Sequence, residues 1–364
     1  MLLSAVLLIL FTGHTALALE GDDIIRSQAD ALELDELRRA AEEYAPDFIW
    51  TETPDLNAGL AGLLDTGTGA LRGVVQKALR SGLLLLSIVL LTALAEGASP
   101  AGSGKTFQAA PLAAALAITA VAVADANSLI GLGREAIGKI EVFSKVLLPT
   151  VAAATAASGA PAGAAARQAA ALLFSDVLIT LINRFFLPLT YTYIAACTAH
   201  AATGNEGLKR VASTLKWTVT TLLTALLLSF VAYLTVSGVI AGAADAVTLK
   251  AAKFTVSSVV PVVGSILSDA AETVLAGASM LKNTVGVFGM LVILGMCVLP
   301  FLQLGIHYLI YKVTSALAAT VADSRAVGLI DGIGGAFGLV LGMTGACALL
   351  MLVSLVSAIK VVSP

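Results

Sequence analysis

Long apolar runs separated by short polar stretches make up most of this chain of 364 residues. An α-helix of about 20 apolar residues is long enough to cross a bilayer. The expected crossings are residues 79–95, 111–132, 169–198, 215–241, 284–311 and 332–359. The runs at 146–157 and 254–281 are shorter or more polar, and either cross or return as hairpins. The pattern predicts an all-α, polytopic membrane protein with about six to eight hydrophobic segments.

The N-terminal region has a different pattern. Residues 1–18 hold an apolar run too short to span a membrane and an A-x-A cleavage signal, which together predict a signal peptide. Residues 19–78 then form an acidic segment outside the cytoplasm, with an amphipathic helix at 21–45. That helix either shields the membrane domain or docks a partner, and residues 79–364 form the multi-span membrane domain.

Composition agrees with a membrane protein and excludes two other classes. The chain is 58% hydrophobic and 12% charged, with a mean hydropathy of +0.94, whereas soluble domains carry about 25% charged residues. Residues 20–55 hold twelve of the 24 acidic residues and three of the 21 basic ones. The membrane domain is therefore mildly basic, and without a basic tract no nucleic-acid partner is expected.

A weak internal repeat relates two parts of the membrane domain. Pro149 and Pro188 are 39 residues apart, and so are Pro261 and Pro300. This spacing suggests repeats at about 146–241 and 258–359, as in transporters whose interrupted helices mark a central site; chance alignment of prolines is the alternative. Basic residues at 209–216 and 312–325 favour two cytoplasmic loops. An even number of crossings between them makes the repeats parallel, and an odd number makes them inverted.

The most unusual stretch lies at 253–289, where an apolar run is punctuated by polar groups. Ionisable residues at membrane depth are costly and by default indicate function. The candidate site residues of this stretch are Pro261, Gly264, Ser268, Asp269, Glu272, Lys282 and Asn283. They are expected to form a structural element or to line a conduit.

Arg184 is the other candidate, because it lies near the middle of a long apolar run with Pro188 close behind. Asp176, Asp125 or the acidic residues of the 253–289 stretch are candidate partners for it. A structural salt bridge inside the bundle and a side chain that lines an aqueous path are both consistent with this position.

Gly334, Gly338 and Gly342 recur every four residues, so they lie on one face of a helix. Small residues at this spacing let another helix approach closely. The partner helix belongs either to the same bundle, to a second copy of the chain or to another membrane protein.

No enzyme, cofactor or metal is expected. Asp269 and Glu272 share a helix face and resemble an acid–base pair, but no nucleophile or metal ligand accompanies them. The three Cys and three His residues are scattered. Residues 99–106 (SPAGSGKT) mimic a P-loop, yet the first glycine is missing and both neighbours are expected membrane spans.

The sequence of the 253–289 stretch resembles the stage III sporulation protein AE family of endospore-forming bacteria. The short motifs that carry the resemblance are Lys253-Phe254, Pro261-Val262-Val263-Gly264, Ser268-Asp269-Ala270, Glu272-Thr273-Val274, Leu281-Lys282-Asn283 and Val285-Gly286. Tyr311-Lys312 and the residues at 323–325 resemble further motifs of the family. Residues 96–110 carry no part of the resemblance.

The resemblance implies a role in endospore formation. Members of this family belong to a group of mother-cell proteins that, with a forespore partner, build a secretion-like channel between mother cell and forespore. The resemblance therefore implies a multi-pass protein of the mother-cell-derived outer forespore membrane, with the other membrane proteins of that complex, the lipid bilayer and other copies of itself as partners. The repeat and the buried charges favour an alternative function, a secondary transporter or export gate for a small molecule or protein.

Overall fold

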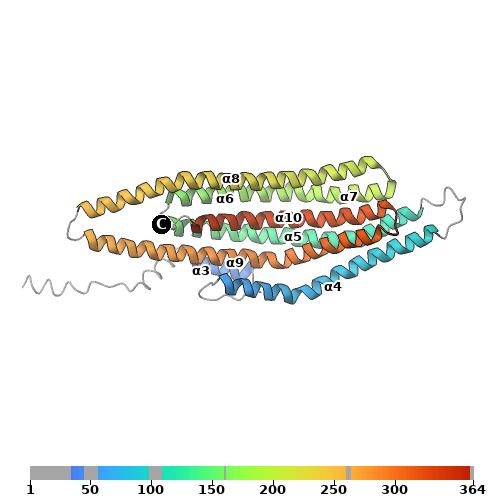
Figure 1. Cartoon of the computed structure of the whole chain (residues 1–364), viewed down its shortest axis with the longest axis horizontal. Helices are drawn as coiled ribbons and strands as arrows, with labels where there is room; N and C mark the ends of the chain where they lie inside the picture. The colour runs from blue at the N-terminus through green and yellow to red at the C-terminus, as the bar shows by residue number, and fades with distance from the viewer. Residues whose placement is uncertain (1–33, 45–55, 98–108, 160, 260–263, 361–364) are drawn as a thin grey trace, which may run out of the picture.

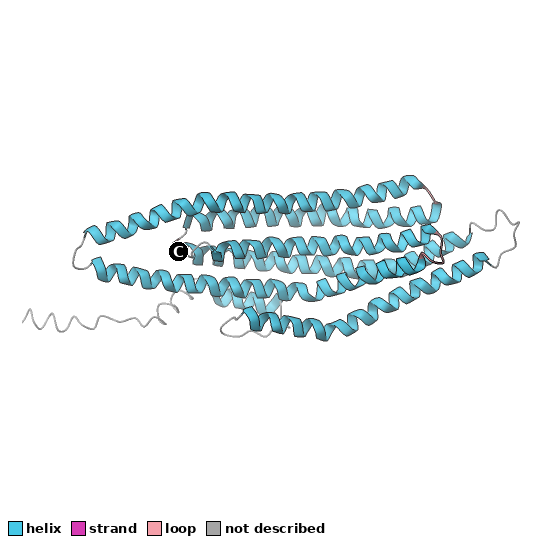
Figure 2. Cartoon of the chain, viewed as in Figure 1, coloured by secondary structure: helices cyan, strands magenta, loops and turns pink. Residues whose placement is uncertain are grey.

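The computed structural model describes residues 34–44, 56–97, 109–159, 161–259 and 264–360, and between 237 and 277 it describes the backbone alone. Within these ranges the chain is helical apart from short turns and contains no strand (Figure 2). The helices are α3 (Leu34–Tyr44), α4 (Leu56–Gly97), α5 (Ala109–Ala157), α6 (Pro161–Leu181), the π-helix η2 (Ile182–Phe186), α7 (Leu187–Thr203), α8 (Glu206–Val259), α9 (Gly264–Ala318) and α10 (Ser324–Lys360).

Six long helical rods run side by side along the long axis of the molecule, with α6, η2 and α7 joined into one of them (Figure 1). Each rod of the described chain is long and apolar enough to cross a membrane. The all-α, polytopic membrane fold predicted from the sequence is therefore confirmed. The predicted signal peptide at 1–18 lies outside the described residues.

The rods are much longer than a bilayer is thick. Helices α8 and α9 have 54 and 55 residues, which at about 1.5 Å per residue gives roughly 80 Å, whereas the hydrocarbon core measures about 30 Å. The end of α8 and the beginning of α9 extend past the end of α10 (Figure 1). These two helices therefore project beyond the end of the central helix α10.

The two ambiguous segments are parts of longer helices. Residues 146–157 form the end of α5, which continues through Pro149. A proline inside a helix removes one hydrogen bond, and here the buried side chains of Leu147, Leu148 and Val151 hold the helix in the bundle. Residues 254–281 are shared between the end of α8 and the beginning of α9, so this run is neither a single crossing nor a separate hairpin.

Helix α4 begins at Leu56 and continues without interruption to Gly97. Residues 56–78 and the crossing expected at 79–95 therefore form a single helix, across the expected domain boundary at residue 79. The extracytoplasmic placement of residues 19–78 stays a prediction.

Two turns lie together at one end of the bundle. Gly204 has a φ of 72° and ends α7, and a Cβ atom at this position would lie 2.8 Å from Cζ of Arg325 at the start of α10. The α7–α8 turn and the α9–α10 turn therefore lie at the same end, and α8 and α9 connect them. The α6–α7 rod and α9 run in the same direction, as do α8 and α10 (Figure 1). The repeats themselves stay a prediction.

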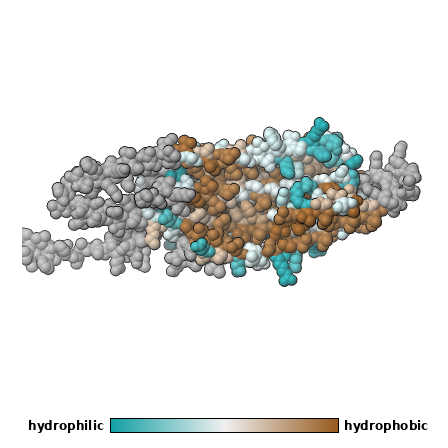
Figure 3. Space-filling view, in the orientation of Figure 1, coloured by the Kyte–Doolittle hydropathy of each residue, from teal (hydrophilic) through white to brown (hydrophobic). Residues whose placement is uncertain are grey.

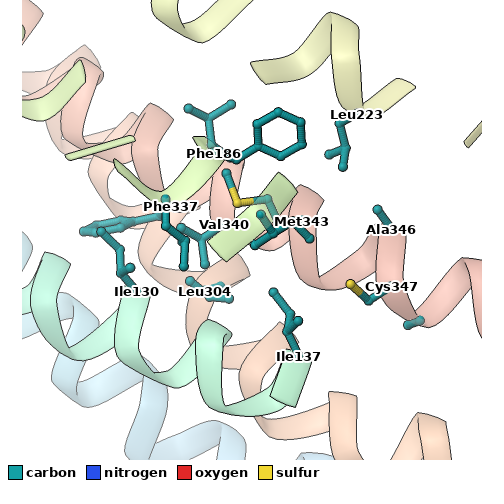
Figure 4. Packing of buried hydrophobic residues seen from close by; sticks show 14 of the residues in the cluster. Ile130, Ile137, Phe186, Leu223, Leu304, Phe337, Val340, Met343, Ala346 and Cys347 are labelled. Carbon is teal, nitrogen blue, oxygen red and sulfur yellow. The ribbon is translucent and has the colours of Figure 1, made fainter. Parts of the chain in front are cut away.

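Helix α10 lies at the centre of the bundle, and α8 lies at its edge. In the apolar window of α10, 61% of the residues are buried, against 17% in that of α8. Phe337, Val340 and Met343 of α10 are fully buried. Around them pack Ile130 and Ile137 of α5, Phe186 of η2, Leu223 of α8 and Leu304 of α9 (Figure 4).

The surface of the bundle has an apolar middle and a polar end. Apolar side chains cover its middle, and polar side chains gather at the end where α7 turns into α8 (Figure 3). Helix α3 lies in the acidic N-terminal segment, buries Leu37 and Ala41 and exposes Glu36 and Arg38. Helix α3 packs against α5, so its apolar stripe lies on the membrane domain itself.

Candidate functional site

Arg184 lies in the π-helix that joins α6 to α7. A proline cannot donate a backbone hydrogen bond, and the π-helix ends two residues before Pro188. Ile182 and Phe186 are fully buried, whereas Asn183 and Arg184 are exposed. Short π-helical segments inside long helices often occur at functional sites. The interruption read from the sequence is thus a local widening of a continuous rod.

The pairing expected between Arg184 and Asp176 is absent. Arg184 forms no ion pair with any residue whose side chain is described. Asp176 instead lies near Lys145 of α5, with which it interacts electrostatically. Asp125, another candidate partner, accepts a hydrogen bond from Tyr311 of α9. The π-helix places Arg184 on the outer surface of the bundle, away from these carboxylates.

The candidate residues of the 253–289 stretch lie along the beginning of α9. Pro261 is outside the described residues, and Gly264 is the first residue of α9. Ser268, Asp269 and Glu272 follow in the same helix, in the part where only the backbone is described. The structure therefore gives these three residues one helix but no side-chain contacts.

Lys282 and Asn283 lie farther along α9, which continues through both residues to Ala318. Asn283 is exposed, whereas the side chain of Lys282 is only 1% exposed. A buried lysine inside a membrane bundle is costly, so its neighbours matter.

Arg167 of α6 is the neighbour of Lys282, and it is 4% exposed. The two cations are close enough to repel one another. A cavity of about 20 Å³ lies beside Arg167, room for about one water molecule; Thr155, Ala164, Gln168 and Ser354 are among its lining residues. Sequence reasoning missed Arg167, although it is a single charge in an alanine-rich run.

A second polar cluster lies nearer the end that carries the α7–α8 turn. Tyr311 of α9 donates a hydrogen bond of 2.8 Å from its Oη to Oδ2 of Asp125 in α5. Lys312 donates from Nζ to Oδ1 of Asp331 in α10 over 2.6 Å. These contacts link α9 to α5 and to α10. In the sequence, the Tyr311-Lys312 pair resembled a motif of the family, but nothing in it indicated that Asp125 and Asp331 are its partners.

The glycine stripe of α10 lies against tyrosines of α9. A Cβ atom at Gly334 would lie 3.0 Å from Cβ of Tyr311, and one at Gly338 would lie 3.1 Å from the ring of Tyr308. A Cβ atom at Gly342 would lie 3.7 Å from Cδ2 of Leu223 in α8, an ordinary van der Waals contact. All three glycines therefore meet helices of their own chain.

The two clusters hold charged and hydroxyl-bearing side chains of four helices. Within the part of the chain that the structure describes, no three His, Cys, Asp or Glu side chains gather closely enough to hold a metal ion. The chemistry that the buried charges support is electrostatic: they attract water or ions into the bundle, or they hold helices in register.

Comparison with known proteins identifies the family. A family model described as stage III sporulation protein AE matches residues 62–362, which take in most of the first rod and all of the other five. The chain belongs to the stage III sporulation protein AE family. The motifs that contain Lys282 and Tyr311 carried the resemblance to this family, and they lie in the two polar clusters described above.

The stage III sporulation protein AE of Bacillus subtilis (strain 168) is 26% identical over 197 residues. That match covers 54% of this chain and 49% of the relative, so the chain aligns with about half the length of this curated relative. No solved structure matches the chain. Family membership makes it a sporulation-related membrane protein with several spans.

Proposed function

We propose that the chain is an integral membrane component of the sporulation channel complex that links mother cell and forespore, and that it is required for late forespore development. The observation that carries the proposal is the family match over residues 62–362, which takes in nearly the whole membrane bundle and not a single motif. Six helices able to span a membrane suit a protein that is embedded in the complex.

Charge at the two ends of the bundle supports an orientation. Lys209, Arg210 and Arg325 lie at the end that holds the α7–α8 and α9–α10 turns, and basic residues favour the cytoplasmic side. In the mother-cell-derived outer forespore membrane, α3 and the junction of α8 with α9 then face the space between the two membranes. The projecting ends of α8 and α9 become the part of the bundle nearest to a forespore partner.

A secondary transporter or export gate in the same membrane is the second candidate. The π-helix that contains Arg184 and the buried pair of basic side chains Lys282 and Arg167 favour it. Interrupted helices and charges inside the bundle are common where transporters bind their substrates.

Deletion of the gene in the organism that encodes the chain tests the proposal. The deletion strain is expected to engulf the forespore and then stop, and a copy of the gene supplied elsewhere restores spores. Normal spore yield without the gene contradicts the proposal.

Two substitutions separate the candidates. If the chain acts as a transporter, Asp269→Asn or Arg184→Gln abolishes spore formation while the protein still copurifies with its complex. If its role is structural, the loss of spores accompanies the loss of the complex.

A further inference from the structure

The outward face of α5 is polar over a length comparable to the thickness of a bilayer. This polar face of α5 consists of Asn127, Ser128, Gly131, Arg134, Glu135, Gly138, Lys139 and Lys145, all at least partly exposed. Residues 127–145 span about 27 Å of helix. Val142 is the single large apolar side chain exposed among the described residues of this stretch.

Contacts between helices show which parts of α9 and α10 lie level with the polar face of α5 along the bundle axis. Gly133 of α5 meets Val340 and Thr344 of α10. Farther along α5, Leu147 meets Gly289 of α9. The polar face of α5 is therefore level with the middle of α9 and α10, and not with the turns at either end.

At this level the opposite side of the bundle is apolar. Residues 217–244 of α8 and 332–359 of α10 contain no Asp, Glu, Lys or Arg. Gly342 of α10 contacts Leu223 of α8, and nearby Leu228 and Leu349 are 65% and 54% exposed. When these apolar faces lie in lipid, the charged face of α5 lies at membrane depth.

A charged helix face at membrane depth contacts either water or protein, because lipid does not solvate it. The charges of α5 are largely matched within the helix. Lys139 pairs with Glu135 at 2.9 Å and Lys145 pairs with Glu141 at 2.8 Å. These pairs remain partly exposed, and Asp176 of α6 adds another charge beside Lys145.

Two copies that met symmetrically through this face would bring their two Arg134 side chains to the same level of the membrane, and like charges at one level repel one another. The glycines leave the face open as well: a Cβ atom at Gly131 or Gly138 would have nothing within 4 Å. Open, internally paired charge is suited to water.

We infer that the polar face of α5 lines a water-filled passage through the membrane, which admits ions and small hydrophilic solutes. This inference deepens the proposed function, on which it rests for the identity of the membrane. The mixed charge of the face gives it no strong preference for anions or cations. The apolar sides of α8 and α10 then hold the passage wall in the lipid.

Cysteine labelling in intact membranes tests the passage. Ser128→Cys, Gly131→Cys and Gly138→Cys are made one at a time in a chain that carries Cys197→Ser, Cys297→Ala and Cys347→Ala. Leu228→Cys and Leu349→Cys, at nearby levels on the apolar side, are the matched controls. The probe is a charged, membrane-impermeant methanethiosulfonate, which reacts with the thiolate form that water supports.

The three α5 positions are expected to react at least about tenfold faster than the two controls, because thiolates form in water and not in lipid. Equal rates at the α5 and control positions overturn the passage. Protection of the α5 positions in membranes, followed by fast labelling after solubilisation in detergent, shows that a protein covers the face and also overturns it. Sporulation is not the readout, so failure here leaves membership of the channel complex standing.

Discussion

Two glycines of α5 lie two residues apart and on opposite sides of the helix, which makes them a matched pair. Gly133 is buried, and a Cβ atom there would run into the side chain of Val340, itself fully buried in α10. Gly131 is exposed and has open space in front of it. We expect Gly133→Ala to destabilise the bundle relative to Gly131→Ala.

The size of the difference follows from two opposing effects. Replacing glycine by alanine inside a helix contributes about 0.8–1.0 kcal/mol of stability through helix propensity, and this gain is common to both variants. Forcing an extra carbon into a packed core costs about 1–3 kcal/mol, and this cost falls on Gly133 alone. The free energies of unfolding of the two variants should therefore differ by about 1–3 kcal/mol.

The protein carries its own reporters for this comparison. Cys297 and Cys347 are 5% and 3% exposed, so a fluorogenic thiol-reactive dye reports the temperature at which the purified bundle opens. Gly131→Ala should unfold at or above the temperature of the parent, and Gly133→Ala should unfold below Gly131→Ala. Equal unfolding temperatures for the two variants would refute the contact between Gly133 of α5 and Val340 of α10. That contact is what places the polar face of α5 level with the middle of α10.

Three further substitutions address other parts of the bundle. Tyr311→Phe removes the hydrogen bond to Asp125. The free energy of unfolding should fall by about 0.6 kcal/mol, and by at most about 1.7 kcal/mol, so the unfolding temperature should fall slightly. Lys282→Met removes a buried charge that lies near Arg167, so the unfolding temperature should rise. Leu37→Ala deletes a buried side chain that packs α3 onto the bundle, at a cost of about 2–5 kcal/mol, so limited proteolysis should cut α3 faster.

Each of these has a control in the same chain. Tyr191→Phe alters an exposed ring and should leave the unfolding temperature of the parent unchanged. A lower unfolding temperature for Lys282→Met would show that the lysine is held by a stabilising partner and would contradict the prediction. Glu36→Ala changes an exposed side chain of α3 and should leave the proteolysis rate unaltered.

The number and type of helices were predictable because the length of apolar runs is a direct consequence of bilayer thickness. The extent of the helices was not, since a helix that leaves the membrane needs no apolar signal. Helix α4 therefore starts at Leu56 among polar residues, and α8 and α9 reach toward each other across the stretch that looked like a hairpin. The interruption near Pro188 was visible because proline acts locally on the backbone.

Contacts between distant segments account for most of what the sequence hid. Tyr311 and Asp125 are 186 residues apart, and neither residue type predicts the other. The burial of Arg167 depends on three surrounding helices and not on its own alanine-rich neighbourhood. The charged part of α5 fell between two expected segments, because its polar outward positions break the apolar run even though its inward positions, such as Ile137 and Ile140, are buried.

Purification of the chain from sporulating cells tests the central claim most directly. An epitope-tagged copy that supports normal spore formation is captured in mild detergent after engulfment, and the proteins that accompany it are quantified by mass spectrometry against an untagged strain. The account predicts that the other membrane proteins of the mother cell–forespore channel copurify in comparable amounts. Recovery of the functional tagged chain without them would contradict it.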